Sequence, residues 1–258
     1  MPTGFAKGFI RSRYPAFANL LRLNLRYAKQ FCGVPPESFE RGAAIWQCLF
    51  EEYGYGRSCQ TNSSVDALGE PIPWYSYPAT EFLSGISFAG KKVWEYGCGN
   101  STLWWAIRAQ LVRAVESEVD WHTLVKKKLP GNASVDLAPD RRAYIDAIRA
   151  DEFRFDVIVV DGLVTDLYRF ECCVAAVDAL EPGGMIILDN SDWLPRSCGW
   201  LVENGFTQID FNGFSPINRC PGRTSVFFRD RMGFGRLPHR PTVGGIVRNW
   251  ELDPANPA

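Results

Sequence analysis

Short apolar runs of strand length alternate with longer segments of helical periodicity through the middle of the chain. The run at 155–162, FDVIVVDG, is rich in β-branched residues, which is typical of a strand buried on both faces of a parallel sheet. Other strand-like runs occur at 92–95, 111–117, 132–138 and 185–190, and helical patterns follow them. This alternation predicts an α/β domain with a largely parallel sheet.

The last third of the chain follows a different pattern. Residues 205–211 and 224–229 are predicted to be two strands that pair with each other, and the loop between them is long enough to cover a site. From 230 to 258, Pro, Gly and Arg dominate, and an irregular tail is expected there.

A basic amphipathic pattern occupies residues 17–31, with Arg22, Arg26 and Lys29 on one helical face. That face can be solvated, can make peripheral contact with an anionic membrane or an acidic partner, or can belong to a targeting segment. The sequence leaves these three interpretations open.

The remaining N-terminal residues predict a second helix at 39–53 and a Gly/Ser/Pro-rich connection at 54–73. We therefore expect three parts. They are a helical appendage with its linker at 1–72, one α/β domain at 73–229 and a tail at 230–258.

Composition and charge narrow the class of protein. The 258 residues are 46% apolar and 22% charged, which is the profile of a soluble globular protein. The net charge of −1 gives no indication of nucleic-acid binding. No apolar run reaches the length of a membrane span and the N-terminus lacks the apolar segment of a signal peptide, so a cytoplasmic location is expected. The eight cysteines show no CxxC spacing, so neither a zinc site nor a redox pair is indicated.

The most informative stretch is KVWEYGCGNSTLWWA at 92–106, which has the pattern of a strand, a glycine turn and a helix. Gly97 and Gly99 are expected to adopt positive φ angles and to let a ligand lie against the main chain. Ser101 or Thr102 is expected to cap the helix that follows.

Glu95, at the end of the strand, indicates what kind of ligand the turn holds. A dinucleotide-binding turn places a pyrophosphate at the helix N-terminus, and a neighbouring carboxylate would repel it. Thr102 also stands where that fingerprint has its third glycine. A ligand with cationic ammonium and sulfonium groups would instead be attracted, and S-adenosylmethionine is such a ligand.

On these residues the stretch resembles motif I of the class I S-adenosylmethionine-dependent methyltransferases. The resemblance extends over about 73–229 and implies a doubly wound, mostly parallel seven-stranded sheet of Rossmann-like type. Its last strand would be antiparallel, and the chain would carry a helical N-terminal appendage. The strand pair at 205–211 and 224–229 fits that last element.

The same resemblance implies a cofactor site around the turn. Glu116 ends the next strand, and 116 minus 99 places it 17 positions beyond Gly99, near the spacing at which a strand-end acid meets an adenosine ribose. The expected cofactor-binding residues are Tyr77, Glu95, Tyr96, Gly97, Cys98, Gly99, Asn100, Ser101, Thr102, Glu116, Ser117 and Asp161.

Two further acids follow strand-like runs and are the candidate catalytic residues, Asp161 and Asp189, which lie 189 minus 161, or 28, positions apart. Together with Asn190 they offer oxygen ligands suited to Mg²⁺, similar to the metal site of catechol O-methyltransferase-like enzymes. The sequence departs from those enzymes after Asp161, because Gly162, Leu163 and Val164 stand where they carry a lysine. A metal site, a metal-free general base or substrate anchor, and a purely structural role remain open.

The function expected from the resemblance is transfer of a methyl group from S-adenosylmethionine to a small-molecule acceptor, at oxygen. The alternatives are a nicotinamide-dependent oxidoreductase of Rossmann type and a non-catalytic module that binds a membrane surface or a partner.

Overall fold

The computed structural model describes residues 36–163 and 165–237. The chain divides into two compact units, Met1–Gln47 and Cys48–Ala258. In the smaller unit the described element is helix α3 (Pro36–Gln47). The basic pattern predicted as a helix at 17–31 lies outside the described residues.

The larger unit begins with a short π-helix η1 (Cys48–Glu52) and helix α4 (Tyr55–Thr61). Residues 54–73 were predicted as a Gly/Ser/Pro-rich connection, and helix α4 within it was not predicted. This unit starts at Cys48, whereas the sequence pattern begins the α/β domain at residue 73.

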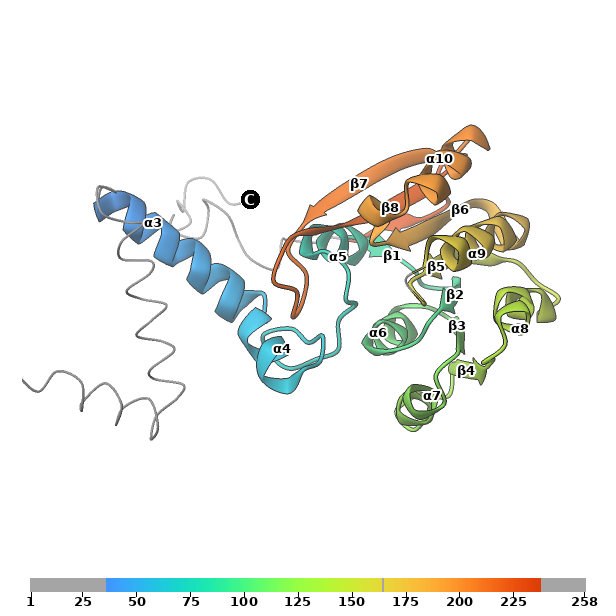
Figure 1. The fold of residues 1–258 in the computed structure, drawn as a ribbon, viewed down its shortest axis with the longest axis horizontal. Helices are drawn as coiled ribbons and strands as arrows, with labels where there is room; N and C mark the ends of the chain where they lie inside the picture. The colour runs from blue at the N-terminus through green and yellow to red at the C-terminus, as the bar shows by residue number, and fades with distance from the viewer. Residues whose placement is uncertain (1–35, 164, 238–258) are drawn as a thin grey trace, which may run out of the picture. The chain divides into compact units, whose positions relative to one another are not determined.

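A seven-stranded sheet in the order β4-β3-β2-β5-β6-β8-β7 forms the centre of the larger unit (Figure 1). Five neighbouring strands are parallel, and β8 runs antiparallel to both β6 and β7. The predicted doubly wound, mostly parallel sheet with an antiparallel last strand is therefore confirmed. The strands are β2 (Lys92–Tyr96), β3 (Leu111–Glu116), β4 (Ala133–Leu137), β5 (Phe155–Val160), β6 (Leu180–Asp189), β7 (Thr207–Gly213) and β8 (Gly222–Phe228).

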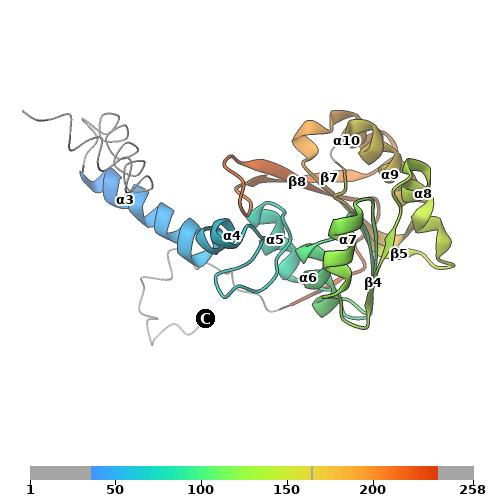
Figure 2. The same cartoon turned by 60° about the horizontal axis from the view of Figure 1, so that its bottom comes forward.

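Helices cover both faces of this sheet because the side chains of each strand alternate between the two faces. On β2, Val93 packs with Trp105 of the following helix in the apolar cluster on one face of the sheet. The next residue, Trp94, packs in the cluster on the other face. Figures 1 and 2 show the helices on their two sides. One side carries α5 (Tyr77–Ser84), α6 (Asn100–Arg108) and α7 (Val119–Lys126), and the other carries α8 (Arg141–Asp146), α9 (Asp166–Ala179) and α10 (Pro195–Glu203).

Two details differ from the sequence prediction. β6 begins before the strand-like run predicted at 185–190, and its first half contains a shift of register in the pairing with β5 and Gly183 with a φ of 76°. In the predicted irregular tail, β9 (Gly235–Arg236) pairs with β1 (Ile86–Ser87). In the described part of the chain no helix is long and apolar enough to cross a membrane.

Candidate functional site

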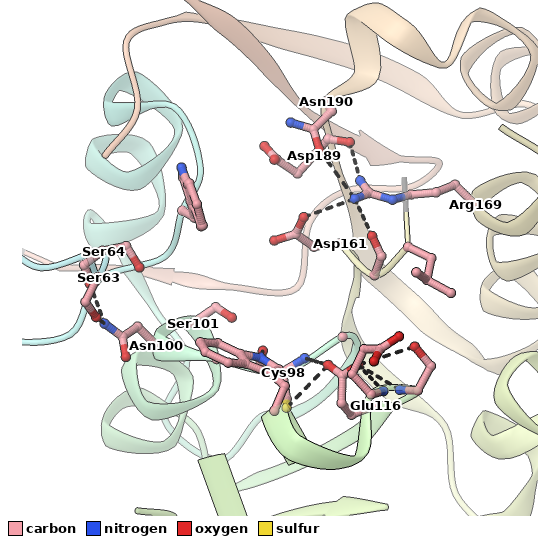
Figure 3. A pocket seen from close by; sticks show the side chains of 18 of the residues that line it. Ser63, Ser64, Cys98, Asn100, Ser101, Glu116, Asp161, Arg169, Asp189 and Asn190 are labelled. Carbon is pink, nitrogen blue, oxygen red and sulfur yellow. Dashed lines mark hydrogen bonds and ion pairs between the residues drawn. The ribbon is translucent and has the colours of Figure 1, made fainter. Parts of the chain in front are cut away.

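A cavity of about 570 Å³ opens at the carboxyl ends of the parallel strands (Figure 3). It is lined by the glycine turn after β2 and by the ends of β3, β5 and β6, with segment 62–64, Trp74 and Asn218 completing the wall. Open α/β sheets bind ligands at this edge, where the strand order reverses, here between β2 and β5. The volume is within the range of small-molecule sites.

The glycine turn depends on one glycine rather than two. Gly97 has a φ of 94°, and a Cβ there would lie 3.0 Å from the carbonyl oxygen of Asp161. Gly99 has a φ of 169°, which is extended backbone open to any residue, so the expectation of positive φ at both positions was wrong for Gly99. A glycine is therefore required at 97, where β2 and β5 approach each other.

Helix α6 begins differently from the prediction. Gly99 is its N-cap, and Thr102, at the third helical position, accepts a hydrogen bond from the Gly99 N–H at 3.0 Å. The expected cap at Ser101 or Thr102 was therefore wrong by two or three positions. Asn100 fixes the same end of the helix to another part of the wall, because its Nδ2 donates to Ser63 Oγ at 2.9 Å and to the Ser64 carbonyl at 2.6 Å.

Glu116 lies on the cavity wall opposite the strand ends of β5 and β6, with its carboxylate held by backbone donors (Figure 3). Its Oε1 accepts from the N–H groups of Ser117 at 2.7 Å and Glu118 at 3.0 Å, and its Oε2 accepts from the Cys98 N–H at 3.3 Å. The Ser117 hydroxyl also lies 3.4 Å from Oε1, and the Cys98 thiol lies 3.6 Å from Oε2. Together these contacts fix the orientation of the carboxylate on the cavity wall.

Arg169, from α9, connects the ends of β5 and β6 on the other side of the cavity (Figure 3). Its side chain is 2% exposed. One terminal nitrogen donates to the carbonyls of Val160 and Asp189, and the other donates to the Gly162 carbonyl, Asp161 Oδ1 and Asn190 Oδ1. The guanidinium thus lies among the candidate catalytic residues.

Burial raises the pKa of three carboxyl groups near the carboxyl ends of β2, β5 and β6. The pKa of Asp161 rises to about 6, because desolvation outweighs the opposing charge and hydrogen bond of Arg169. The pKa of Asp189 rises to about 8 through desolvation and the neighbouring charge of Asp161, although Thr224 donates to its Oδ1 at 2.5 Å. The pKa of Glu95 rises to about 8 through desolvation, against hydrogen bonds from Thr102 and Ser101.

The residues expected to hold Mg²⁺ do not fit a divalent ion. The Asp161 and Asn190 oxygens accept from Arg169, and one Asp189 oxygen accepts from Thr224. A cation placed between these oxygens would lie against a permanently charged guanidinium. Among the residues that the structure describes, no group of three or more His, Cys, Asp or Glu side chains could hold a metal ion.

The predicted cofactor-binding residues separate into two groups. Eight of them line the cavity, namely Gly97, Cys98, Gly99, Asn100, Ser101, Glu116, Ser117 and Asp161. Tyr77, Glu95, Tyr96 and Thr102 are absent from its wall. Tyr96 points to the opposite face of the sheet, where its hydroxyl donates to the Ile145 carbonyl, and the Tyr77 ring packs on Tyr53 with centroids 4.8 Å apart. Glu95 is 1% exposed.

Several wall residues had no counterpart in the sequence prediction. Arg169 stands eight positions after Asp161, and a basic residue in the first turns of a helix carries no signal for a strand-end contact. The segment 62–64 and Asn218 come from stretches predicted as linker and loop. Apart from these unpredicted residues, the wall carries three partly exposed tryptophans, Trp74, Trp121 and Trp193, with exposed fractions of 45%, 47% and 65%.

Comparison with solved structures finds similar folds at low sequence identity. The O-methyltransferase TomG from Streptomyces achromogenes, in complex with SAM, aligns over 71% of this chain and 90% of its own at 13% identity, with a TM-score of 0.50. The precorrin-6y C5,15-methyltransferase from Geobacter metallireducens aligns over 58% and 87% at 14% identity, with a TM-score of 0.48. An rRNA methylase from Streptococcus thermophilus aligns over 57% and 90% at 15% identity, with a TM-score of 0.45.

No protein-family model matches the chain, and no curated protein matches it in sequence. At 13% identity the likeness to TomG shows the fold alone.

Proposed function

We propose that this chain, which has the fold of class I S-adenosylmethionine-dependent methyltransferases, binds S-adenosylmethionine in the cavity and methylates a small-molecule acceptor at oxygen. The proposal rests on one observation, namely that the N–H groups of the glycine turn donate to acceptors within the protein. The Gly97 N–H donates to the Val115 carbonyl, the Cys98 N–H to Glu116 and the Gly99 N–H to Thr102.

These hydrogen bonds argue against a dinucleotide. A pyrophosphate at a helix N-terminus needs free N–H donors and a positive potential. Here the three donors of the turn have protein partners, and the carboxylate of Glu116 lies beside them. The nicotinamide-dependent oxidoreductase is therefore the weaker alternative. The membrane-surface module rests on the basic pattern at 17–31, outside the described residues, and stays a prediction.

We infer an orientation of the ligand from the charges on the wall. Glu116 would accept the two ribose hydroxyls, because its carboxylate lies on the cavity wall and is held in place by backbone donors. The ammonium and sulfonium groups would face Asp161, on the other side of Gly97. The similar O-methyltransferase TomG, which is described in complex with SAM, is consistent with this choice of ligand.

The acceptor would lie over Asp161, Asp189 and Trp193, beyond the glycine turn. S-adenosylmethionine supplies an electrophilic methyl carbon, and the electron pair of the broken S–C bond stays on sulfur. The chain would hold the acceptor oxygen in line with that carbon, exclude water with the surrounding tryptophans and receive the hydroxyl proton on an Asp161 oxygen. Asp161 suits this role because its side chain remains 24% exposed to the cavity.

Isothermal titration calorimetry with S-adenosylhomocysteine and with NADH tests the ligand class. We expect S-adenosylhomocysteine to bind and NADH to bind more weakly or not at all. Glu116→Gln should weaken S-adenosylhomocysteine binding by about tenfold to a hundredfold, because charge-assisted hydrogen bonds contribute about 1.5–3 kcal/mol.

Glu118→Gln is the matched control, because it removes one negative charge from the same wall without touching the carboxylate held by Cys98. We expect less than a threefold loss for this variant. Tighter binding of NADH than of S-adenosylhomocysteine, or equal losses in the two variants, would count against the proposed ligand and its orientation.

A further inference from the structure

We propose that the guanidinium of Arg169 is a built-in cation that takes the place of a divalent metal ion at the acceptor end of the cavity. It acts as a positioning residue, because it fixes the Asp161 carboxylate and the Asn190 amide that would face the acceptor. The role toward an acceptor rests on the proposed methyltransferase function, whereas the exclusion of a metal ion rests on the geometry of Arg169 alone.

The geometry of Arg169 is that of a cross-link between two strand ends. One nitrogen, Nη1, donates to the Val160 carbonyl of β5 at 3.2 Å and to the Asp189 carbonyl of β6 at 2.6 Å. The other, Nη2, donates to the Gly162 carbonyl at 2.6 Å. These three bonds to main-chain oxygens hold the guanidinium at one place between the strands, so it is a fixed charge and not a mobile surface group.

The two remaining bonds reach the side-chain oxygens that a metal would need. Nη2 lies 3.3 Å from both Asp161 Oδ1 and Asn190 Oδ1. Asn190 has a φ of 55°, in the left-handed region, directly after the last residue of β6. A Mg²⁺ ion coordinated at about 2.0–2.1 Å from these oxygens would have to displace the guanidinium.

Displacement is unfavourable for two physical reasons. An arginine side chain does not lose its proton in proteins, so a divalent ion would meet an undiminished positive charge at close range. The side chain is also 2% exposed, so moving it would remove the donor from the buried carbonyl oxygens of Val160 and Asp189.

Arginine suits this place better than lysine. Its planar fork presents two terminal nitrogens at a fixed separation, one reaching both strands and the other reaching both side chains. A lysine would retain the charge but would have three donors on one atom, and so could replace only some of these bonds.

Manganese ion is a suitable probe, because its binding can be followed by electron paramagnetic resonance without knowledge of the acceptor. We expect the wild-type protein to bind no Mn²⁺ at this place at millimolar concentration. Arg169→Gln should gain Mn²⁺ binding by at least tenfold, because the oxygens of Asp161, Asp189 and Asn190 then have no neighbouring guanidinium charge. Adding Asp161→Asn to that variant should abolish the gain, and Arg169→Lys, which keeps the charge, should not bind the ion.

Two results would overturn the proposal. One is Mn²⁺ binding by the wild-type protein that Asp161→Asn removes, a measurement that decides the question even if the glutamine variant does not fold. The other is a folded Arg169→Gln variant with no gain. Titration of the wild-type protein with S-adenosylhomocysteine, with and without chelator, tests the proposed methyltransferase function independently of Arg169. If that ligand does not bind, the proposed methyltransferase function fails while the manganese results still decide the role of Arg169.

Discussion

Replacing Glu95 by glutamine isolates the free-energy cost of burying a carboxyl group behind the glycine turn. Glu95 is the penultimate residue of β2, is 1% exposed and has one oxygen, Oε2, without a hydrogen-bond partner in the described structure. Glutamine has nearly the same shape and keeps an acceptor for the hydrogen bonds from Thr102 and Ser101. The substitution therefore removes the ionisation while changing the packing little.

The magnitude follows from the pKa of Glu95, which burial raises from 4.5 to about 8 in the folded protein. The folded state then holds the proton more tightly than the unfolded state. Stability from this group is fully present below pH 4.5 and is lost as the pH rises toward 8. At about 1.4 kcal/mol per pH unit, the loss reaches roughly 5 kcal/mol when the group is ionised in both states.

Urea unfolding between pH 5 and 9 measures this difference. We expect Glu95→Gln to be more stable than the wild-type protein by an amount that grows by about 1.4 kcal/mol per pH unit up to about pH 8 and then levels off. Glu203→Gln, on the exposed end of α10, is the control and should show no such trend. A difference between Glu95→Gln and wild type that stays constant over this range would refute the reasoning.

Two further substitutions test the packing of the site by urea unfolding. Gly97→Ala should destabilise the protein by about 1–3 kcal/mol, because φ is 94° and the new Cβ would lie 3.0 Å from the Asp161 carbonyl oxygen. Gly131→Ala is the control and should be close to neutral, because there is open space around Gly131. Equal losses of stability in the two variants would contradict the argument. Thr224→Val should cost about 1–3 kcal/mol, because it removes the bond that Thr224 donates to Asp189 and the bond that it accepts from the Ser76 N–H. The cost should be larger at high pH, because losing the bond to Asp189 raises the pKa of that group further. A cost for Thr224→Val that is the same at pH 5 and pH 9 would be evidence against that bond.

Local sequence periodicity determined the fold class. The β-branched run of β5 and the strand, turn and helix at 92–108 each depend on residues that are neighbours in the chain. Their alternation leaves few ways to bury the apolar side chains other than a parallel sheet between helices. The position of Glu116 at a strand end followed from the same reasoning, because parallel strands end at one edge.

The sequence was less reliable for side-chain direction within the turn. It assigned every residue from Glu95 to Thr102 to the cofactor site, yet Tyr96 points to the α8 face and Thr102 turns back to its own helix. Side chains alternate along a strand, so adjacent residues at its end cannot all face one cavity. Gly99 shows the same limit, because a glycine in the sequence does not by itself determine φ.

Tertiary structure alone decided the acceptor end of the cavity. Arg169 lies on α9, yet it binds the ends of β5 and β6, and Asn100 reaches segment 62–64 from α6. These contacts join residues far apart in the chain, and their geometry depends on how strands and helices pack. Whether Asp161 and Asn190 face a metal ion or a guanidinium therefore depends on a side chain that local patterns do not place.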